Sequence, residues 1–347
     1  MKNSNEFIVP RCFAPRGRNG GRLCALILSC LSLRALLNRS NSEKGLASLA
    51  GVVDNMCESA WKGFSPRPLK DYSGSVDLVV SHCEGDLHSV TDLIASHRVH
   101  KVHVYSKCTQ PNLKGIPAIT VVQRLQNRGR CDHTYAHHIV TKICNSPRPS
   151  AESKVVLFMK DTNRVHQQAE RHSISDMVRA AAGDQGFSCG LTPLVTDKHF
   201  RYTNLSSWHD VNTLRRFSMN HYKNGIYNDS SANFRSSYIN FGEWLDSIGM
   251  VFTTDPIPVC YGGVFAVKYE QFSNDVCSVL QSALRSLNRA DNIEESHYME
   301  RLWAALLINA DFMMHISSNI PRIARGFIHK EYYGYLGTYH GCRKVAP

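Results

Sequence analysis

The stretch VDLVVS, residues 76–81, decides the fold, because it is short, mostly apolar and rich in β-branched valine. A run of this length and composition predicts a strand that is buried on both faces. The same signal recurs in three later runs: residues 99–105 (VHKVHVY), 118–122 (AITVV) and 155–159 (VVLFM). Repeated buried strands of this kind are typical of a parallel sheet.

Apolar residues with helical spacing occur around these runs, at residues 87–94, 132–143 and 174–182. Parallel strands need long crossover connections, which are usually helical. The alternation of runs and helical segments therefore predicts an α/β fold with a mainly parallel central sheet flanked by helices. In such folds, ligands bind at the carboxyl ends of the strands.

The last third of the chain continues the pattern. Residues 251–254 are predicted to form a strand, and the glycine pair at 262–263 a tight turn into another strand. Apolar residues fall on one helical face across residues 272–287, and a second helix is predicted at 294–308. Because no internal repeat occurs, residues 71–347 are predicted to form one α/β domain.

The composition of the 347-residue chain is that of a folded protein, with 43% hydrophobic and 20% charged residues. Its formal net charge of +11 is unevenly distributed. Residues 1–70 hold eleven Lys or Arg and four Asp or Glu, a balance of +7, which leaves +4 for the remainder. A nucleic-acid-binding domain carries its basic excess on the folded part, so this distribution argues against a nucleic-acid partner.

The basic leader has the pattern of a targeting segment. Four arginines precede the uncharged run LCALILSCLSL at residues 23–33. The run is too short to span a bilayer, but its length and basic flank fit a secretory signal or a short signal anchor. Residues 1–37 are therefore expected to send the domain, on a stem at 38–70, into the Golgi or endoplasmic reticulum lumen, as a type II membrane protein if the segment is an anchor. A transit peptide or a disordered tail is the open alternative.

Glycosylation triplets and cysteines agree with a luminal domain. Acceptor triplets begin at Asn38, Asn204 and Asn228. The chain has twelve cysteines, which is many for a cytosolic protein, and no Cys-x-x-Cys pair, so a structural zinc site of the usual kind is not expected. Nine cysteines follow Cys30, so at least one thiol stays free if the others pair.

Polar residues are densest in the segment NRGRCDHTYAHH at 127–138, which follows a predicted strand and opens a predicted helix. Guanidinium groups, a glycine and the amides of a helix N-terminus are the groups that hold a diphosphate. The candidate anion-binding residues are Arg128, Gly129, Arg130, Asp132 and His133. The alternative is that Asn127 or Asp132 caps the helix and both arginines are solvated.

Further candidates lie near other predicted strands. Asp161 follows the run at 155–159, where a carboxylate can meet a metal or a ligand hydroxyl, or can begin a turn. Gly262 and Gly263 form a tight turn or let a ligand approach the backbone. Glu300 lies in the last predicted helix, where apolar neighbours would raise its pKa and make it a base, with a surface carboxylate paired to an arginine as the alternative.

Metal-ligand patterns are weak in this sequence. His133 and His137 are four residues apart, so they share one face of the predicted helix, a spacing that suits zinc. The acid of a His-Glu-x-x-His motif is missing, which favours packing or surface roles for both histidines. No Asp-x-Asp pair occurs in the chain.

A series of short blocks resembles the domain-of-unknown-function family 3431, which is itself similar to glycosyltransferases of the A-type nucleotide-sugar fold. The resemblance covers roughly residues 75–308. The blocks that carry it are residues 77–81 with 84–87, 104–107, 127–130 with 133–135 and 137–139, 156–159, 262–267, and 300–303.

The resemblance implies a Rossmann-like fold of the A type and transfer of a sugar from a nucleotide-diphosphate donor to a hydroxyl of a glycan or glycoconjugate acceptor. It implies a diphosphate clamp formed by Arg128, Arg130 and the helix N-terminus at 132–133, and a base, Glu300. Asp161 would then lie near the ribose or near a divalent metal such as Mn²⁺ or Mg²⁺.

Two departures from the family keep other functions open. Cys131 stands where an acid is usual, and Lys160 and Asp161 stand where a Gln-Gly pair is usual. An inactive luminal protein that binds a sugar or a nucleotide is therefore one alternative. A metal-dependent hydrolase built on His133, His137 and Asp161 is another.

Overall fold

The structure, a computed structural model, describes residues 74–116, 120–145, 153–161, 169–171, 173–193, 205–219 and 233–311. The predicted leader and stem at 1–70 and the acceptor asparagines of all three glycosylation triplets lie outside these residues. Within the described part, no helix combines the length and apolar character needed to cross a membrane.

Strand β1 (Ser75–His82) is the strand predicted from VDLVVS, and all eight of its residues are buried. It pairs in parallel with β2 (Val99–Ser106) and with β4 (Ser153–Lys160). On the far side of β2 lies the parallel edge strand β3 (Thr120–Arg124). The four predicted strands are confirmed, with ends that differ by one or two residues from the prediction.

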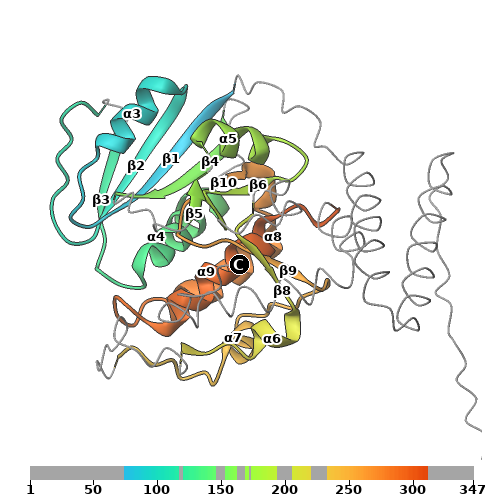
Figure 1. Cartoon of the computed structure of the whole chain (residues 1–347). Coiled ribbons are helices and arrows are strands. Elements are labelled where there is room, and N and C mark those ends of the chain that lie inside the picture. Colours follow the sequence, from blue (N-terminus) through green and yellow to red (C-terminus); the bar gives the residue numbers. More distant parts are fainter. Residues whose placement is uncertain are drawn as a thin grey trace, which may run out of the picture. The chain divides into compact units, whose positions relative to one another are not determined.

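Two antiparallel strands extend the sheet beyond β4. Strand β10 (Phe265–Lys268) pairs with β4 on one side and with β6 (Phe187–Cys189) on the other. The six strands therefore lie in the order β3-β2-β1-β4-β10-β6 (Figure 1). The predicted α/β class and the mainly parallel sheet are confirmed.

Helices cover both faces of this sheet, and the alternation of side chains in β1 decides which core each helix joins. Leu78 and Val80 pack in one buried cluster with residues of α3 (His88–Ser96) and α5 (Ile174–Ala182). Val79 faces the other way, into a larger cluster. The helices of that second cluster are α4 (Arg130–His138), α8 (Asn274–Ser286) and α9 (Glu294–Leu307).

Helix α9 forms the centre of the larger core. Tyr298, Leu302 and Trp303 are fully buried, and only Glu300 and Ala305 are less than fully buried between the two ends of the helix. The remaining elements are short: β5 (Ala169–Arg171), β7 (Leu191–Pro193), β8 (Ser207–His209), α6 (Val211–Arg215), α7 (Phe241–Ser247), β9 (Ile257–Val259) and the single-turn helix η3 (Tyr269–Gln271).

Two predicted elements need correction. The strand expected at 251–254 is wrong, because this stretch has no partner strand and Val251 is 73% exposed. The strand of this region is β9, which pairs antiparallel with β8 outside the main sheet. The helix expected at 132–143 ends as an α-helix at His138 and continues as a π-helical segment, η1 (Ile139–Cys144).

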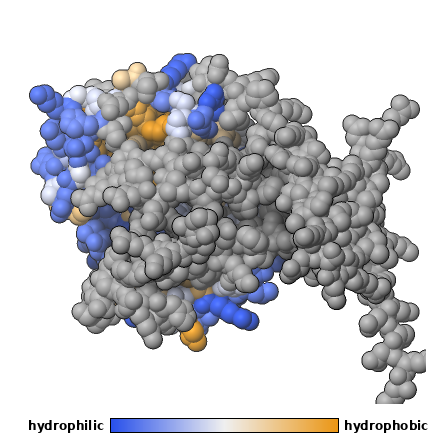
Figure 2. All heavy atoms as spheres, in the orientation of Figure 1, coloured by the Kyte–Doolittle hydropathy of each residue, from blue (hydrophilic) through white to orange (hydrophobic). Residues whose placement is uncertain are grey.

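Three disulfides connect the described residues: Cys83–Cys108, Cys144–Cys277 and Cys189–Cys260. Cys131 is a free, buried thiol. A free thiol among paired cysteines agrees with the odd number found in the sequence. Much of the described surface visible in Figure 2 is hydrophilic. The large exposed hydrophobic residues of the described part are Leu113, Val121, Val122, Ile239 and Val251.

Candidate functional site

Side chains from three separate elements meet at the carboxyl end of β4. Arg130 begins α4, Lys160 ends β4 and Glu300 lies in the middle of α9. Arg130 Nη1 lies 3.9 Å from Glu300 Oε2. We call this group the Arg130 cluster; its members are Arg130, Cys131, Asp132, Lys160, Gly262, Gly263 and Glu300.

The glycine pair closes one side of the Arg130 cluster. The backbone N–H of Gly262 donates to Glu300 Oε1 over 3.0 Å. Gly263 has a φ of 65°, and a Cβ atom there would lie 2.7 Å from Lys160 Cε and 2.8 Å from Cys131 Sγ. The two glycines therefore form the tight turn, one of the two predicted alternatives, and it brings the backbone close to the side chains of Lys160 and Cys131.

Glu300 is held as an anion. Arg130 and Arg301 each place a guanidinium nitrogen 3.9 Å from its Oε2 atom. Burial would raise the pKa of Glu300, but the two guanidinium groups outweigh it and lower the pKa to about 2. The expectation that apolar neighbours raise this pKa is therefore wrong, because the sequence does not show which cations fold against the helix.

The pKa of Asp132 is shifted in the opposite direction. It is 1% exposed, and Trp303 Nε1 donates to its Oδ1 atom over 2.8 Å. Burial raises the pKa of Asp132 to about 6, and the nearby charge of Glu300 adds to the rise while Arg130 opposes it. The two carboxyl groups thus differ in proton affinity, a pattern typical of acid–base sites.

The backbone that presents Arg130 has an unusual conformation. Gly129, the N-cap of α4, has a φ of 55°, and no side chain caps the helix, so neither alternative cap is used. Arg130 follows with a φ of 51°, the one positive φ outside glycine in the part of the chain that is described. The N–H groups of both residues donate to carbonyls of the α8–α9 connection, Ala290 O at 2.6 Å and Asp291 O at 3.1 Å.

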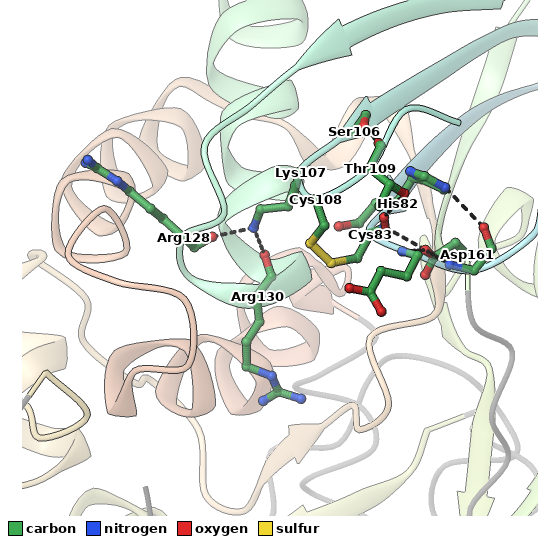
Figure 3. Close-up of a disulfide and its surroundings, with 12 residues drawn as sticks. His82, Cys83, Ser106, Lys107, Cys108, Thr109, Arg128, Arg130 and Asp161 are labelled. Atoms are coloured by element: carbon green, nitrogen blue, oxygen red, sulfur yellow. Dashed lines mark hydrogen bonds between the residues drawn. A yellow bond between two sulfur atoms is a disulfide. The ribbon is translucent and has the colours of Figure 1, made fainter. Parts of the chain in front are cut away.

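Two predicted anion-binding residues lie outside the Arg130 cluster. Arg128 Nη1 donates to the backbone oxygen and to Oδ1 of Asn288, at 2.9 and 3.0 Å, on the exposed surface. Figure 3 shows the side chains of Arg128 and Arg130 extending in different directions. His133 is buried one turn into α4, and burial, with help from Lys107, lowers its pKa to about 3, so it is neutral at physiological pH.

Asp161 holds a loop. Its Oδ2 atom accepts the backbone N–H groups of Cys83, Glu84 and Gly85, at 2.6, 3.1 and 2.9 Å. Cys83 in turn is bonded to Cys108, and Asp161 lies across this disulfide from Arg128 and Arg130 (Figure 3). Among the described residues, no group of three or more His, Cys, Asp or Glu side chains is placed to hold a metal ion. The Mn²⁺ or Mg²⁺ site that the resemblance implies near Asp161 stays a prediction.

Replacing Asp161 with asparagine is expected to loosen the loop at 83–85. An amide oxygen accepts the three N–H groups less strongly than a carboxylate, a loss of about 1–3 kcal/mol locally. Hydrogen exchange followed by mass spectrometry should show faster exchange at 83–85 and unchanged exchange in β1. Glu84→Gln, at an exposed position of the same loop, is the matched control and should leave both rates unchanged. Equal rates in the wild type and Asp161→Asn would contradict the anchoring role.

Four histidines pack together between β2 and α4, away from the Arg130 cluster. The rings of His103 and His138 lie 4.7 Å apart, and those of His133 and His137 stack at 6.2 Å. Tyr105 Oη lies 2.9 Å from His138 Nδ1. Burial lowers the pKa of every member of this group, that of His103 to about 4. The pair His133 and His137 is thus part of a neutral packing cluster.

These histidines predict a loss of stability in acid. The unfolded chain binds a proton at His103 near pH 6.5, whereas the folded chain binds it only near pH 4. The free energy of unfolding should therefore fall as pH drops from 6.5 to 4, by up to about 1.4 kcal/mol per pH unit for each such histidine. In urea titrations, His103→Phe should make this slope shallower by up to about one proton. An unchanged slope in His103→Phe would contradict this prediction.

Sequence reasoning missed several members of the site's surroundings. Arg130 Nη1 lies 3.1 Å from His297 Nδ1, and the Arg301 guanidinium lies 3.9 Å from the centre of the Phe217 ring. His297 and Arg301 lie within one helical turn of Glu300 on α9. This spacing is the one feature of the sequence that could have marked them as neighbours of Glu300. Lys160 appeared in the sequence only as a departure from the family pattern.

Comparison of the chain with protein-family models, with curated proteins and with solved structures finds no match.

Proposed function

We propose that the protein is a glycosyltransferase with an A-type nucleotide-sugar fold, which moves a sugar from a nucleotide-diphosphate donor to the hydroxyl of a glycan or glycoconjugate acceptor. The observation that carries the proposal is the grouping of Arg130, Lys160 and Glu300 at the carboxyl end of β4. Ligands of α/β sheets bind at this edge.

Arg130 and Lys160 supply what a diphosphate leaving group requires. Negative charge builds up on this group as the bond to the sugar breaks, and fixed cations stabilise it best in a partly buried site. The Arg130 side chain is 25% exposed and the Glu300 side chain 13%, so the cluster is accessible to a ligand and still largely shielded from water. The clamp in this proposal contains Arg130 and Lys160 and does not include Arg128.

Glu300 remains the proposed base for the acceptor hydroxyl. In the ligand-free protein its pKa of about 2 makes it a weak base. A bound diphosphate would share the positive charge of Arg130, and the pKa of Glu300 would then rise toward the range in which a carboxylate removes a proton efficiently. Donor binding would thereby prepare the base, with Asp132 as a neighbouring carboxyl of higher proton affinity.

The disulfides support the proposed compartment. Three disulfides among the described residues are typical of a protein that folds in an oxidising lumen. Together with the basic leader, they support the Golgi or the endoplasmic reticulum as the location, where glycan acceptors are processed. Attachment to the membrane through residues 1–37 belongs to the same proposal.

A binding protein without transferase activity is the second candidate. Cys131 favours it, because burial raises the pKa of this thiol to about 11 and leaves a neutral group where the family that the sequence resembles usually carries an acid. The engagement of Asp161 by three backbone amides favours it as well.

A panel of nucleotide-sugar donors tests the proposal. The full chain, produced in an oxidising compartment, is incubated with each donor, with and without Mn²⁺, and release of the nucleoside diphosphate is measured alongside thermal unfolding. Release with at least one donor supports a transferase, and stabilisation without release supports the binding protein. If no donor stabilises the protein or is cleaved, the proposed function is wrong.

A further inference from the structure

Lys107 is a buried lysine with an unusual set of partners. It is 5% exposed and follows β2 directly. Its Nζ atom donates to the backbone carbonyl oxygens of Arg128 and Arg130. Figure 3 shows the ammonium group between these two carbonyls. Burying a cation without a close carboxylate partner is costly, so a lysine placed in this way calls for a specific role.

The backbone of Lys107 is fixed independently of its side chain. Its N–H donates to His82 O over 2.9 Å. The next residue, Cys108, is disulfide-bonded to Cys83, and the N–H of Thr109 donates to Cys83 O. The ammonium group therefore extends from a rigid base formed by the ends of β1 and β2.

The two carbonyls bracket the left-handed turn at the start of α4. A non-glycine residue at φ 51°, as Arg130 is, adopts a strained backbone conformation that persists only where its surroundings impose it. The N–H groups of Gly129 and Arg130 are held from one side by the α8–α9 connection. Lys107 holds the carbonyl side of the same turn, so the peptide groups are fixed from both directions.

We propose that Lys107 is a positioning residue, whose ammonium group fixes the turn at 128–130 and thereby directs the Arg130 guanidinium toward Glu300 and the diphosphate of the donor. The ligand in this inference rests on the proposed function. The control of Arg130 by Lys107 does not, because it is a property of the ligand-free protein.

Several charged groups surround Lys107 and set its proton affinity. Burial lowers the pKa of Lys107 to about 8, and Arg130 lowers it further, while Cys131, Asp291 and Asp132 oppose the shift. His133, the remaining titratable group of α4 close to the ammonium, is neutral in this range. Lys107 is thus the group near the turn that loses a proton just above neutral pH.

A double-mutant cycle with inorganic pyrophosphate as the probe tests the inference. By calorimetry at pH 7, Lys107→Met is expected to weaken pyrophosphate binding about tenfold. In the Arg130→Met background the same change should alter the residual affinity less than about twofold, because the residue that it positions is gone. Lys101→Met, at an exposed position of β2, is the matched control and should leave the affinity unchanged. Equal losses in both backgrounds would overturn the inference.

A pH series separates positioning from general stabilisation. The affinity advantage of the wild type over Lys107→Met should be constant up to about pH 7 and shrink toward one as pH rises past 8, whereas a purely structural effect gives a constant ratio. If Lys107→Met does not fold, Lys107→Gln takes its place, since its amide can donate to the carbonyls without a charge.

A second measurement applies if pyrophosphate does not bind to the protein at all. Absence of pyrophosphate binding would count against the proposed function only. The Nε–H signal of Arg130 in nitrogen-15 NMR then reports its surroundings directly, and it should shift in Lys107→Met and stay in place in Lys101→Met. An unshifted signal in Lys107→Met would overturn the positioning role.

Discussion

Replacing Arg130 with methionine is expected to weaken pyrophosphate binding by about 10-fold to 100-fold, because a hydrogen bond from a charged donor contributes about 1.5–3 kcal/mol. The guanidinium is the cation that reaches from α4 into the cluster, where its Nη1 atom lies 3.9 Å from Glu300 Oε2. Methionine keeps most of the length and apolar contact of the side chain and removes the charge. Calorimetry at pH 7 measures the affinity, and circular dichroism confirms that the variant is folded.

Arg128→Met is the matched control for this prediction. Its guanidinium bonds to Asn288 at the surface, so pyrophosphate affinity should change by less than about twofold. Equal losses in the two variants would mean that both arginines clamp the anion, as the sequence predicts. A loss confined to Arg128→Met would place the anion on the other side of the turn and would contradict the Arg130 cluster as the donor site.

Gly129→Ala is expected to destabilise the protein by about 3–5 kcal/mol, which combines a left-handed backbone penalty with a steric clash. An alanine Cβ at this position would lie 2.5 Å from the backbone oxygen of Leu287 and 2.8 Å from His133 Cβ. The first of these atoms belongs to the backbone and cannot rotate away. Urea unfolding of the wild type and the variant measures the difference in free energy.

Gly249→Ala separates the two causes. Gly249 has a φ of 77°, but an alanine Cβ there would meet no atom within 4 Å, so this variant reports the backbone penalty alone, about 1–2 kcal/mol. The difference between the two variants is the cost of the clash. Equal destabilisation would show that α4 can move away from the α8–α9 connection, and pyrophosphate affinity would then be the more informative property of Gly129→Ala.

The fold could be predicted from the sequence because buried parallel strands carry a strong local signal. The valine-rich runs at 76–81 and 155–159 need no knowledge of the rest of the chain. The stretch at 251–254 shows the limit of such signals: its residues favour a strand, but a strand also needs a partner, and pairing is a tertiary property. The spacing of apolar residues did not predict that α4 continues as a π-helical segment at Ile139–Cys144.

The candidate site was predictable in outline and not in its electrostatics. Strand ends and a glycine turn marked Arg130 and the glycine pair, the family resemblance marked Glu300, and the structure brings these residues together. Sequence alone assigned Arg128 and Arg130 the same role, because the direction of a side chain in an irregular turn depends on what packs against it. The low pKa of Glu300 and the contacts of Lys107 both depend on residues distant in the sequence, so no local pattern could reveal them.

The bonds that join the start of α4 to the α8–α9 connection and to α9 itself have a mechanical consequence. Two backbone hydrogen bonds, the Arg128–Asn288 contact and the Trp303–Asp132 bond join these segments at four points. Helix α4, which carries the Arg130 guanidinium, and helix α9, which carries the Glu300 carboxylate, should therefore move as a single rigid body. Any hinge that admits or releases a bulky ligand has to be sought elsewhere in the chain, and the spacing between the Arg130 guanidinium and the Glu300 carboxylate should stay constant when a ligand binds.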